Sequence, residues 1–114
     1  MTSVSVSLKG ISMSEVTIVF WRDIPAQVIA GRGRGAVKLP LPEQFEQAID
    51  RCAMKIGARD ADAYMAEWRK AAPVTHAQPD AEAAEATRAR ILAEYDSVRF
   101  AALIANDGWD TPRP

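Results

Sequence analysis

The hydrophobic pattern of the chain changes once, near residue 40, and this change limits the fold more than any other feature. Before it, Glu15 to Trp21 is rich in β-branched and aromatic residues that favour a strand. Both faces of this strand are largely apolar, which predicts a strand that is central in its sheet or covered on both sides. Ala26 to Ala30 and Ala36 to Leu39 are two further strand candidates. After residue 40, apolar residues recur at helical spacing, and this separation of strands from helices predicts an α+β fold.

The expected layout is a small N-terminal antiparallel sheet of two or three strands, then two short helices and one long C-terminal helix. The first helix is introduced by residues 41–44 and ends at Gly57. The second covers residues 61–70, with Asp60 as its N-cap. The long helix begins at Asp80 and ends at about residue 104. Its first residues are strong helix formers, and a regular apolar repeat follows them to the end of the helix.

The chain is expected to form one domain. Its 114 residues are enough for a single modest core. Residues 72–79 contain two prolines and are expected to be a linker between the second and the long helix. We expect a flexible N-terminus at residues 1–14, the α+β domain at residues 15–106 and a C-terminal tail at residues 107–114.

Charge is unevenly distributed along the chain, although the formal net charge is only −1. Residues 1–38 carry five lysines or arginines against Glu15 and Asp23, whereas residues 39–114 carry nine basic and thirteen acidic residues. Proteins that bind nucleic acids in general are usually basic overall. The distribution therefore indicates a local contact with an anion or an acidic protein, and no DNA partner.

Few residues in the chain could build a catalytic or metal site. Cys52 is the only cysteine, which excludes an intramolecular disulfide and a cysteine-based zinc site, and it falls on the apolar face of the first helix. His76 is the only histidine and lies in the proline-containing linker, a poor platform for a catalytic base. We therefore expect no catalytic residue, no metal and no cofactor.

No segment of the sequence has the pattern of a membrane span or a targeting signal. No apolar run approaches the length that crosses a bilayer, and the N-terminus lacks the continuous apolar block of a signal peptide. We therefore expect a cytoplasmic protein without a membrane partner.

The most unusual local feature is the run Gly31-Arg32-Gly33-Arg34-Gly35, between the second and third strand candidates. It is no P-loop, because no Lys-Ser/Thr pair at a helix start follows it, and its third glycine comes one residue too early for a dinucleotide fingerprint. One interpretation is a hairpin tip with solvated arginines. The other is an anion or partner site, because guanidinium groups on a rigid tip can pair with phosphate or carboxylate. The candidate binding residues are Arg22, Arg32, Arg34 and Lys38.

Tryptophan supplies a second set of candidates. Trp68 fits the apolar stripe of the second helix and is expected in the core. Trp21 precedes a turn, and Trp109 lies in the polar tail beyond the long helix. Because tryptophan is enriched at binding hot spots, Trp21 and Trp109 are candidates for docking a partner.

Three strings in the chain together resemble a small bacterial family whose domain is labelled only "virulence factor". They are VFWRDIPAQV at residues 19–28, LPEQFEQAIDRCAM at residues 41–54 and DAYMAEWR at residues 62–69. The resemblance covers about residues 15–72 and leaves out the long helix. Alanine is typical of the family at the position of Cys52, which is consistent with a small buried side chain.

The family label implies no chemistry and no catalytic residues. Members also occur fused to helical-repeat regions, which implies an interaction module. Short members are often encoded near folate- and corrinoid-dependent one-carbon enzymes. The resemblance therefore implies a partner such as a one-carbon methyltransferase or reductase subunit.

Two classes of function are the leading hypotheses. The first is a non-catalytic accessory subunit or protein-interaction module, serving a folate- or corrinoid-dependent methyl-transfer complex, with the long helix as a surface for another protein. The alternative is a small anion-binding module that uses the basic Gly-Arg hairpin to bind a folate tail, a nucleotide or an RNA phosphate. A stand-alone enzyme ranks third, because no base–nucleophile pair can be assembled. Homo-oligomerisation stays open.

Overall fold

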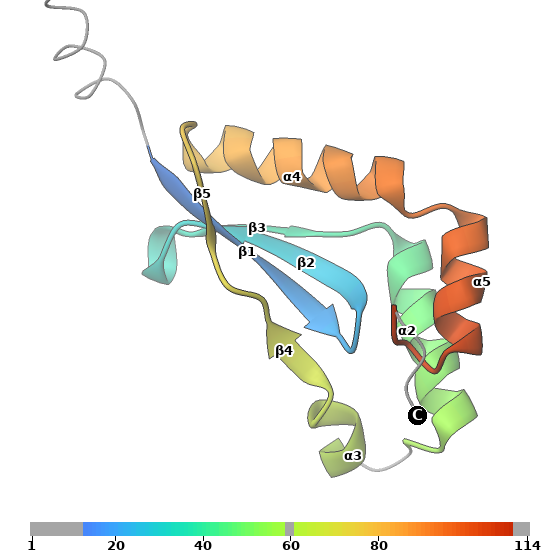
Figure 1. The fold of residues 1–114 in the computed structure, drawn as a ribbon. Helices are drawn as coiled ribbons and strands as arrows, with labels where there is room; N and C mark the ends of the chain where they lie inside the picture. The colour runs from blue at the N-terminus through green and yellow to red at the C-terminus, as the bar shows by residue number, and fades with distance from the viewer. Residues whose placement is uncertain (1–12, 59–60, 111–114) are drawn as a thin grey trace, which may run out of the picture.

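The computed structural model describes residues 13–58 and 61–110 and has the predicted α+β class. Its strands are β1 (Ser14–Trp21), β2 (Ile24–Ala30), β3 (Val37–Pro40), β4 (Trp68–Lys70) and β5 (Val74–His76). Its helices are α2 (Glu43–Ile56), α3 (Ala61–Met65), α4 (Asp80–Glu94) and α5 (Ser97–Ala105), and a 3₁₀ turn, η1, covers Gly33–Gly35. Figure 1 shows α4 lying along the sheet, with α2 and α5 side by side at one end of it.

β1 is the central strand of a five-stranded antiparallel sheet in the order β3-β2-β1-β4, and β5 also pairs with β1. β2 lies along one side of β1, while β5 and β4 share the other side, at residues 14–16 and 19–21. The central position predicted from the two apolar faces is confirmed. The predicted number of strands was too low, because β4 and β5 have three residues each, too few to show an alternating pattern.

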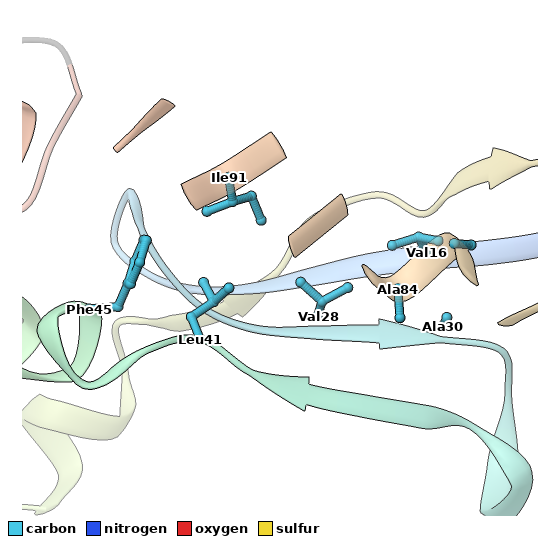
Figure 2. Close-up of a cluster of buried hydrophobic side chains, with 8 residues drawn as sticks. Val16, Val28, Ala30, Leu41, Phe45, Ala84 and Ile91 are labelled. Carbon is cyan, nitrogen blue, oxygen red and sulfur yellow. The ribbon is translucent and has the colours of Figure 1, made fainter. Parts of the chain in front are cut away.

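The main core lies between α4 and one face of the sheet. Figure 2 shows Val16, Val28 and Ala30 of the sheet close to Ala84 and Ile91 of α4. Ala83 and Ala84 place only small side chains between the first part of α4 and the sheet, whereas Ile91 fills the space further along. The remaining buried members of this cluster are Leu41 and Phe45.

A second core lies at the far end of the sheet. Trp21 and Ile24, on either side of the β1–β2 turn, pack there with Ile49 and Cys52 of α2 and with Leu103 of α5. The predicted first helix is confirmed as α2, and it ends at Gly57, which adopts the left-handed conformation (φ 77°) that glycine tolerates best.

The second helix is shorter than the sequence predicts. α3 ends at Met65, and the next residues turn back so that Trp68–Lys70 pairs with β1 as β4. Trp68 lies opposite Trp21, and the amide of Ala71 donates to Ile18 O at 3.0 Å. Pairing with an existing strand outweighs the helical preference of this segment, because tertiary contacts can override intrinsic propensity. The segment predicted as a linker is likewise not structureless, because it contains β5.

The predicted long helix is two helices. α4 ends before Tyr95, whose backbone is extended (φ −109°, ψ 95°), and α5 begins after Asp96. The Asp96 side chain accepts a hydrogen bond from the Arg99 amide at 2.8 Å, an N-cap that favours a new helix at this point. The apolar repeat continues through the break, so spacing alone did not reveal it. The single long helix that the first hypothesis used as a surface for another protein is therefore replaced by α4, which packs on the sheet, and α5, which packs on α2.

Two predictions fall largely outside the described residues. The expected flexible segment 1–14 is described only for Met13 and Ser14, and the expected N-cap Asp60 is not described. Ser14 begins β1 and is buried, and its hydroxyl donates to Asp80 Oδ1 at 2.7 Å. This hydrogen bond joins the start of the central strand to the start of α4.

Candidate binding surface

The face of the sheet opposite α4 carries polar and basic side chains. Thr17 pairs with Ile29, and Ile29 pairs with Lys38, so these three residues share one face. Lys70 pairs with Val19 and lies on the same face. In the described ranges, α4 packs only on the other face, and Figure 1 shows no described helix lying across this one. We call this surface the uncovered face; it is formed by Thr17, Val19, Ile29, Lys38 and Lys70.

A hollow of about 340 Å³ lies on the uncovered face beside the Gly-Arg run. Its lining brings together cations from three segments: Arg32 from the run, Lys38 from β3 and Lys70 from β4. The rest of the lining is small or apolar and consists of Thr17, Ile29, Gly31, Gly33 and Ala36. We call this the basic hollow. Because three positive side chains converge on it, an anionic group is the ligand that it would attract.

The cations near the basic hollow differ in their partners. Arg32 is 82% exposed and forms an ion pair with Glu15, and pairs at such exposure contribute little to stability. Lys38 and Lys70 are exposed, and neither forms an ion pair with any residue that the structure describes. Arg34 is exposed at the tip but does not line the hollow. Both lysines can therefore receive a ligand without first losing a partner.

The Gly-Arg run connects β2 to β3 as a hairpin loop, as the sequence predicts, and contains the 3₁₀ turn. Gly31 and Gly33 have positive φ values of 96° and 66°, in the region that favours glycine. A Cβ atom built on Gly31 would lie 2.5 Å from Asp80 Oδ2, so the loop passes directly against the start of α4. This close contact fixes the base of the loop and thereby the position of Arg32.

Arg22 lies in a different part of the molecule from the other predicted cations. It occupies the β1–β2 turn with a φ of 53°, and its side chain is only 14% exposed. Its Nε atom lies 3.3 Å from Glu67 Oε1, and its Nη1 atom donates to Asp107 O at 2.7 Å. Its guanidinium carbon lies 4.9 Å from the centre of the Trp109 ring, a cation–π contact. Arg22 therefore joins parts of this domain and is not one of the cations of the basic hollow.

The two tryptophans proposed for docking are also placed within the domain. Trp21 is fully buried and its Nε1 atom donates to Tyr64 O at 3.0 Å, so it offers no surface to a partner. Its position beside a turn suggested an edge of the core, but α2 and α5 pack over this end of the sheet. Trp109 is partly buried beside Arg22. Trp68, predicted in the core, is partly buried against the second core.

A second hollow, of about 260 Å³, lies where the uncovered face meets α2 and α3. Tyr64 and Trp68 line it, with ring centres 5.9 Å apart, together with Pro40. Trp68 is two residues from Lys70, and Pro40 is two residues from Lys38, so the strand period of two places both pairs on the same face. We call this the aromatic hollow. The uncovered face thus extends from a basic end to an aromatic end.

Lys70, Thr17 and Ile29 are the lining residues that sequence reasoning missed. Lys70 was assigned to the end of a helix, and Thr17 and Ile29 were read only as strand residues. No pattern within the three residues of β4 shows that this segment returns to β1. The pairing of β4 with β1, a long-range contact, is what brings Lys70 into the lining of the same hollow as Lys38.

Groups with catalytic or ligating chemistry are dispersed. Cys52 is fully buried, and burial raises the pKa of its thiol, with the Lys55 charge as a smaller opposing influence. The thiol therefore packs as a neutral group. His76 lies half-buried in β5. Among the residues that the structure describes, no three His, Cys, Asp or Glu side chains are grouped to hold a metal.

None of the described helices combines the length and apolar composition needed to cross a bilayer.

Comparison with known proteins agrees with the resemblance drawn from the three strings. A family model described as "Virulence factor" matches residues 19–104, well over half of the chain. The chain belongs to the Virulence factor family. The match goes beyond residues 15–72 and includes α4 and nearly all of α5, so both helices are part of the Virulence factor domain and not an addition to it. No curated protein and no solved structure matches the chain.

Proposed function

We propose that this Virulence factor domain is a non-catalytic accessory module that binds an acidic segment of another protein across its uncovered face. The observation that carries the proposal is the basic hollow, in which Arg32, Lys38 and Lys70 converge from three segments of the chain. Charges so arranged attract carboxylates and orient the segment that bears them. The net charge of the whole chain is −1, so this basic site is a local feature.

The aromatic hollow supports a protein partner over a simple anion. Tyr64 and Trp68 expose part of their rings at the other end of the same face. A segment with acidic residues followed by an apolar or aromatic residue would contact both hollows. Aromatic anchors surrounded by polar contacts are the usual source of affinity at protein interfaces.

The basic hollow itself differs from a sheet surface that binds RNA. Single-stranded RNA is commonly held on sheets by aromatic side chains on which the bases stack. The lining of the basic hollow contains no aromatic residue among those described. The two half-exposed rings lie at the far end, beside α3.

The class of partner remains the one that the family resemblance implies, a subunit of a folate- or corrinoid-dependent methyltransferase or reductase. This part of the proposal rests on the resemblance alone. A lysate pull-down identifies the partner. We expect the wild-type domain and an Arg51→Glu control to retain a stoichiometric partner, and Lys38→Glu and Lys70→Glu to lose it. Retention by all four proteins would move the interface away from the uncovered face.

The direct test is a titration of the isotope-labelled domain with a glutamate-rich peptide that carries one aromatic residue. We expect saturable changes at the amides of Thr17, Ile29 and Lys70, and weaker binding at higher salt, because exposed charges are screened. Lys38→Glu should weaken binding about tenfold, because it replaces one of the three positive charges of the basic hollow with a negative charge. Arg51→Glu reverses an exposed charge on α2 outside both hollows and serves as the matched control.

The alternative function, a small-anion module, is favoured by the size of the basic hollow. At about 340 Å³ it is large enough for a phosphate or a folate glutamate tail. Titration with inorganic phosphate, with a nucleotide and with a polyglutamylated folate separates the two functions. Saturable binding of one of these, with no response to the peptide, would replace the accessory module by the anion module. No response to any of the ligands would overturn both.

A further inference from the structure

An apolar pocket of about 320 Å³ lies on the opposite side of the sheet from the basic hollow, between α4 and the β4–β5 connection. Its walls are Val16, Ile18 and Phe20 of β1 and the connecting residues Ala71 and Ala72. The three β1 side chains lie on the face of the sheet that α4 packs against, in a part that the helix does not cover. The volume is within the usual range for sites that hold small molecules.

Thr87, in the wall of this pocket on α4, has an unsatisfied hydroxyl group. The residue is 2% exposed, and its Oγ1 atom has no hydrogen-bond partner within residues 13–58 and 61–110. A threonine inside a helix commonly donates to the carbonyl one turn earlier, but this one does not. Buried polar atoms without partners are rare in native proteins, and each one calls for a specific explanation. A ligand bound in the pocket could supply the hydrogen-bond acceptor that the Thr87 hydroxyl lacks.

Arg90 supplies a positive charge at the mouth of the same pocket. It follows Thr87 by three residues, so both side chains lie on one side of α4. Its side chain is 54% exposed, and among the residues that the structure describes it forms an ion pair only with Glu94, at 3.3 Å. Such exposed pairs within a helix are weak and are readily exchanged for another carboxylate. His76 lies at the rim of the pocket and adds a second polar group there.

We propose that this pocket binds a small carboxylic acid with an apolar body. The body, of about ten non-hydrogen atoms, lies against Val16, Ile18 and Phe20. The carboxylate accepts hydrogen bonds from the Thr87 hydroxyl and the Arg90 guanidinium. A charged acceptor gives the buried hydroxyl its strongest available partner. This site is independent of the proposed protein-binding face, because the two lie on opposite sides of the sheet.

The test uses hydrocinnamate, whose phenyl ring and carboxylate match this description, and hydrocinnamyl alcohol, which has the same body without the charge. We expect saturable amide shifts at Ile18, Phe20, Ala71 and Thr87 with hydrocinnamate, and at least about tenfold weaker binding of the alcohol. No saturable change at these residues up to about 10 mM hydrocinnamate, a concentration that would detect even a weak site, would overturn the proposal.

Two variants distinguish a binding role of the polar groups from a structural one. Thr87→Val keeps the shape of the side chain and removes the unpaired hydroxyl, so the free domain should be at least as stable as the wild type. The same variant, and Arg90→Gln, should each bind hydrocinnamate about tenfold more weakly. Arg51→Gln, on α2, should bind as the wild type does. Unchanged affinity in both pocket variants would show that the acid is not held by Thr87 and Arg90, and would overturn the assignment.

Discussion

At the scale of single residues, side chains with the same chemistry have different roles because of where the chain places them. Arg22 and Arg32 are only ten positions apart, yet the Arg22 side chain is 14% exposed and the Arg32 side chain 82% exposed. Arg22 donates to the Asp107 carbonyl, whereas Arg32 pairs with Glu15 at the surface. The neighbours of an arginine thus decide whether it stabilises the fold or is available to a ligand.

Gly31 provides a prediction at this scale. Gly31→Ala would place a methyl group 2.5 Å from Asp80 Oδ2 and would force a residue with a Cβ to adopt a φ of 96°. We expect a loss of about 2 kcal/mol in the free energy of unfolding. Chemical denaturation followed by circular dichroism measures it.

Gly35 is the matched control in the same loop. It has no positive φ, and a Cβ built there meets nothing within 4 Å. Gly35→Ala should therefore leave stability unchanged or raise it slightly, by less than about 1 kcal/mol, because alanine restricts the unfolded chain. Equal effects of the two substitutions would show that the contact of Gly31 with Asp80 does not hold the loop.

At the scale of elements, the break between α4 and α5 decides how the C-terminal half packs. A helix continued from Asp80 would be about 37 Å long, at 1.5 Å per residue, and would pass beyond the sheet. The extended backbone at Tyr95 and Asp96 turns the chain so that α5 lies along α2, as Figure 1 shows. Phe100 then meets Phe45 edge to face, with ring centres 4.9 Å apart. Because of the break, α4 can pack on the main core while α5 packs on the second core.

Asp96→Ala tests this role. The substitution removes the acceptor for the Arg99 amide at the first turn of α5. We expect a loss of about 1 kcal/mol in the free energy of unfolding, the usual cost of removing an N-cap. Glu94→Ala, which removes only an exposed pair with Arg90, should cost less than about 0.5 kcal/mol. A loss for Asp96→Ala no larger than that for Glu94→Ala would show that the cap does not stabilise the start of α5.

At the scale of the whole molecule, contacts join segments of the domain that are far apart in the sequence. The Arg22 side chain, in the β1–β2 turn, reaches Glu67 between α3 and β4 and also Asp107 after α5. Asp23 accepts from the Asp110 amide at 2.7 Å and pairs with Arg69 at 2.8 Å. A single turn near the start of the domain therefore fixes the position of β4 and of the segment after α5.

Arg22→Ala is the corresponding prediction. It would leave the Asp107 carbonyl and the Glu67 carboxylate without their partner in a site that is largely shielded from water. We expect a loss of about 2 kcal/mol. Trp109 fluorescence should also shift, because the ring loses the cation beside it.

Arg34→Ala is the control for this substitution. Arg34 is exposed at the tip of the Gly-Arg loop, away from these contacts. Its removal should change stability by less than about 0.5 kcal/mol, as is usual for surface positions. If Arg22→Ala were equally mild, other contacts would hold the β1–β2 turn to Glu67 and to the segment after α5.

The sequence by itself determined the features that depend on local pattern. The strand-then-helix order predicted the α+β class, the apolar faces of residues 15–21 predicted a central strand, and Gly57 marked the end of α2. The Gly-Arg run was correctly read as a hairpin connection. Each of these depends on the conformational preferences of neighbouring residues, which a short window contains.

Only the tertiary structure decided what depends on distant partners. β4 forms because residues 68–70 pair with the side of β1 that β2 does not occupy, and this pairing places Lys70 in the lining of the same hollow as Lys38. The burial of Trp21 and Arg22 requires α2, α5 and the segment after it, residues far along the chain. A one-dimensional pattern records what a residue is, but not which distant surface reaches it. The hollows, the pocket beside Thr87 and the separation of Arg22 from the other cations are consequences of such long-range contacts.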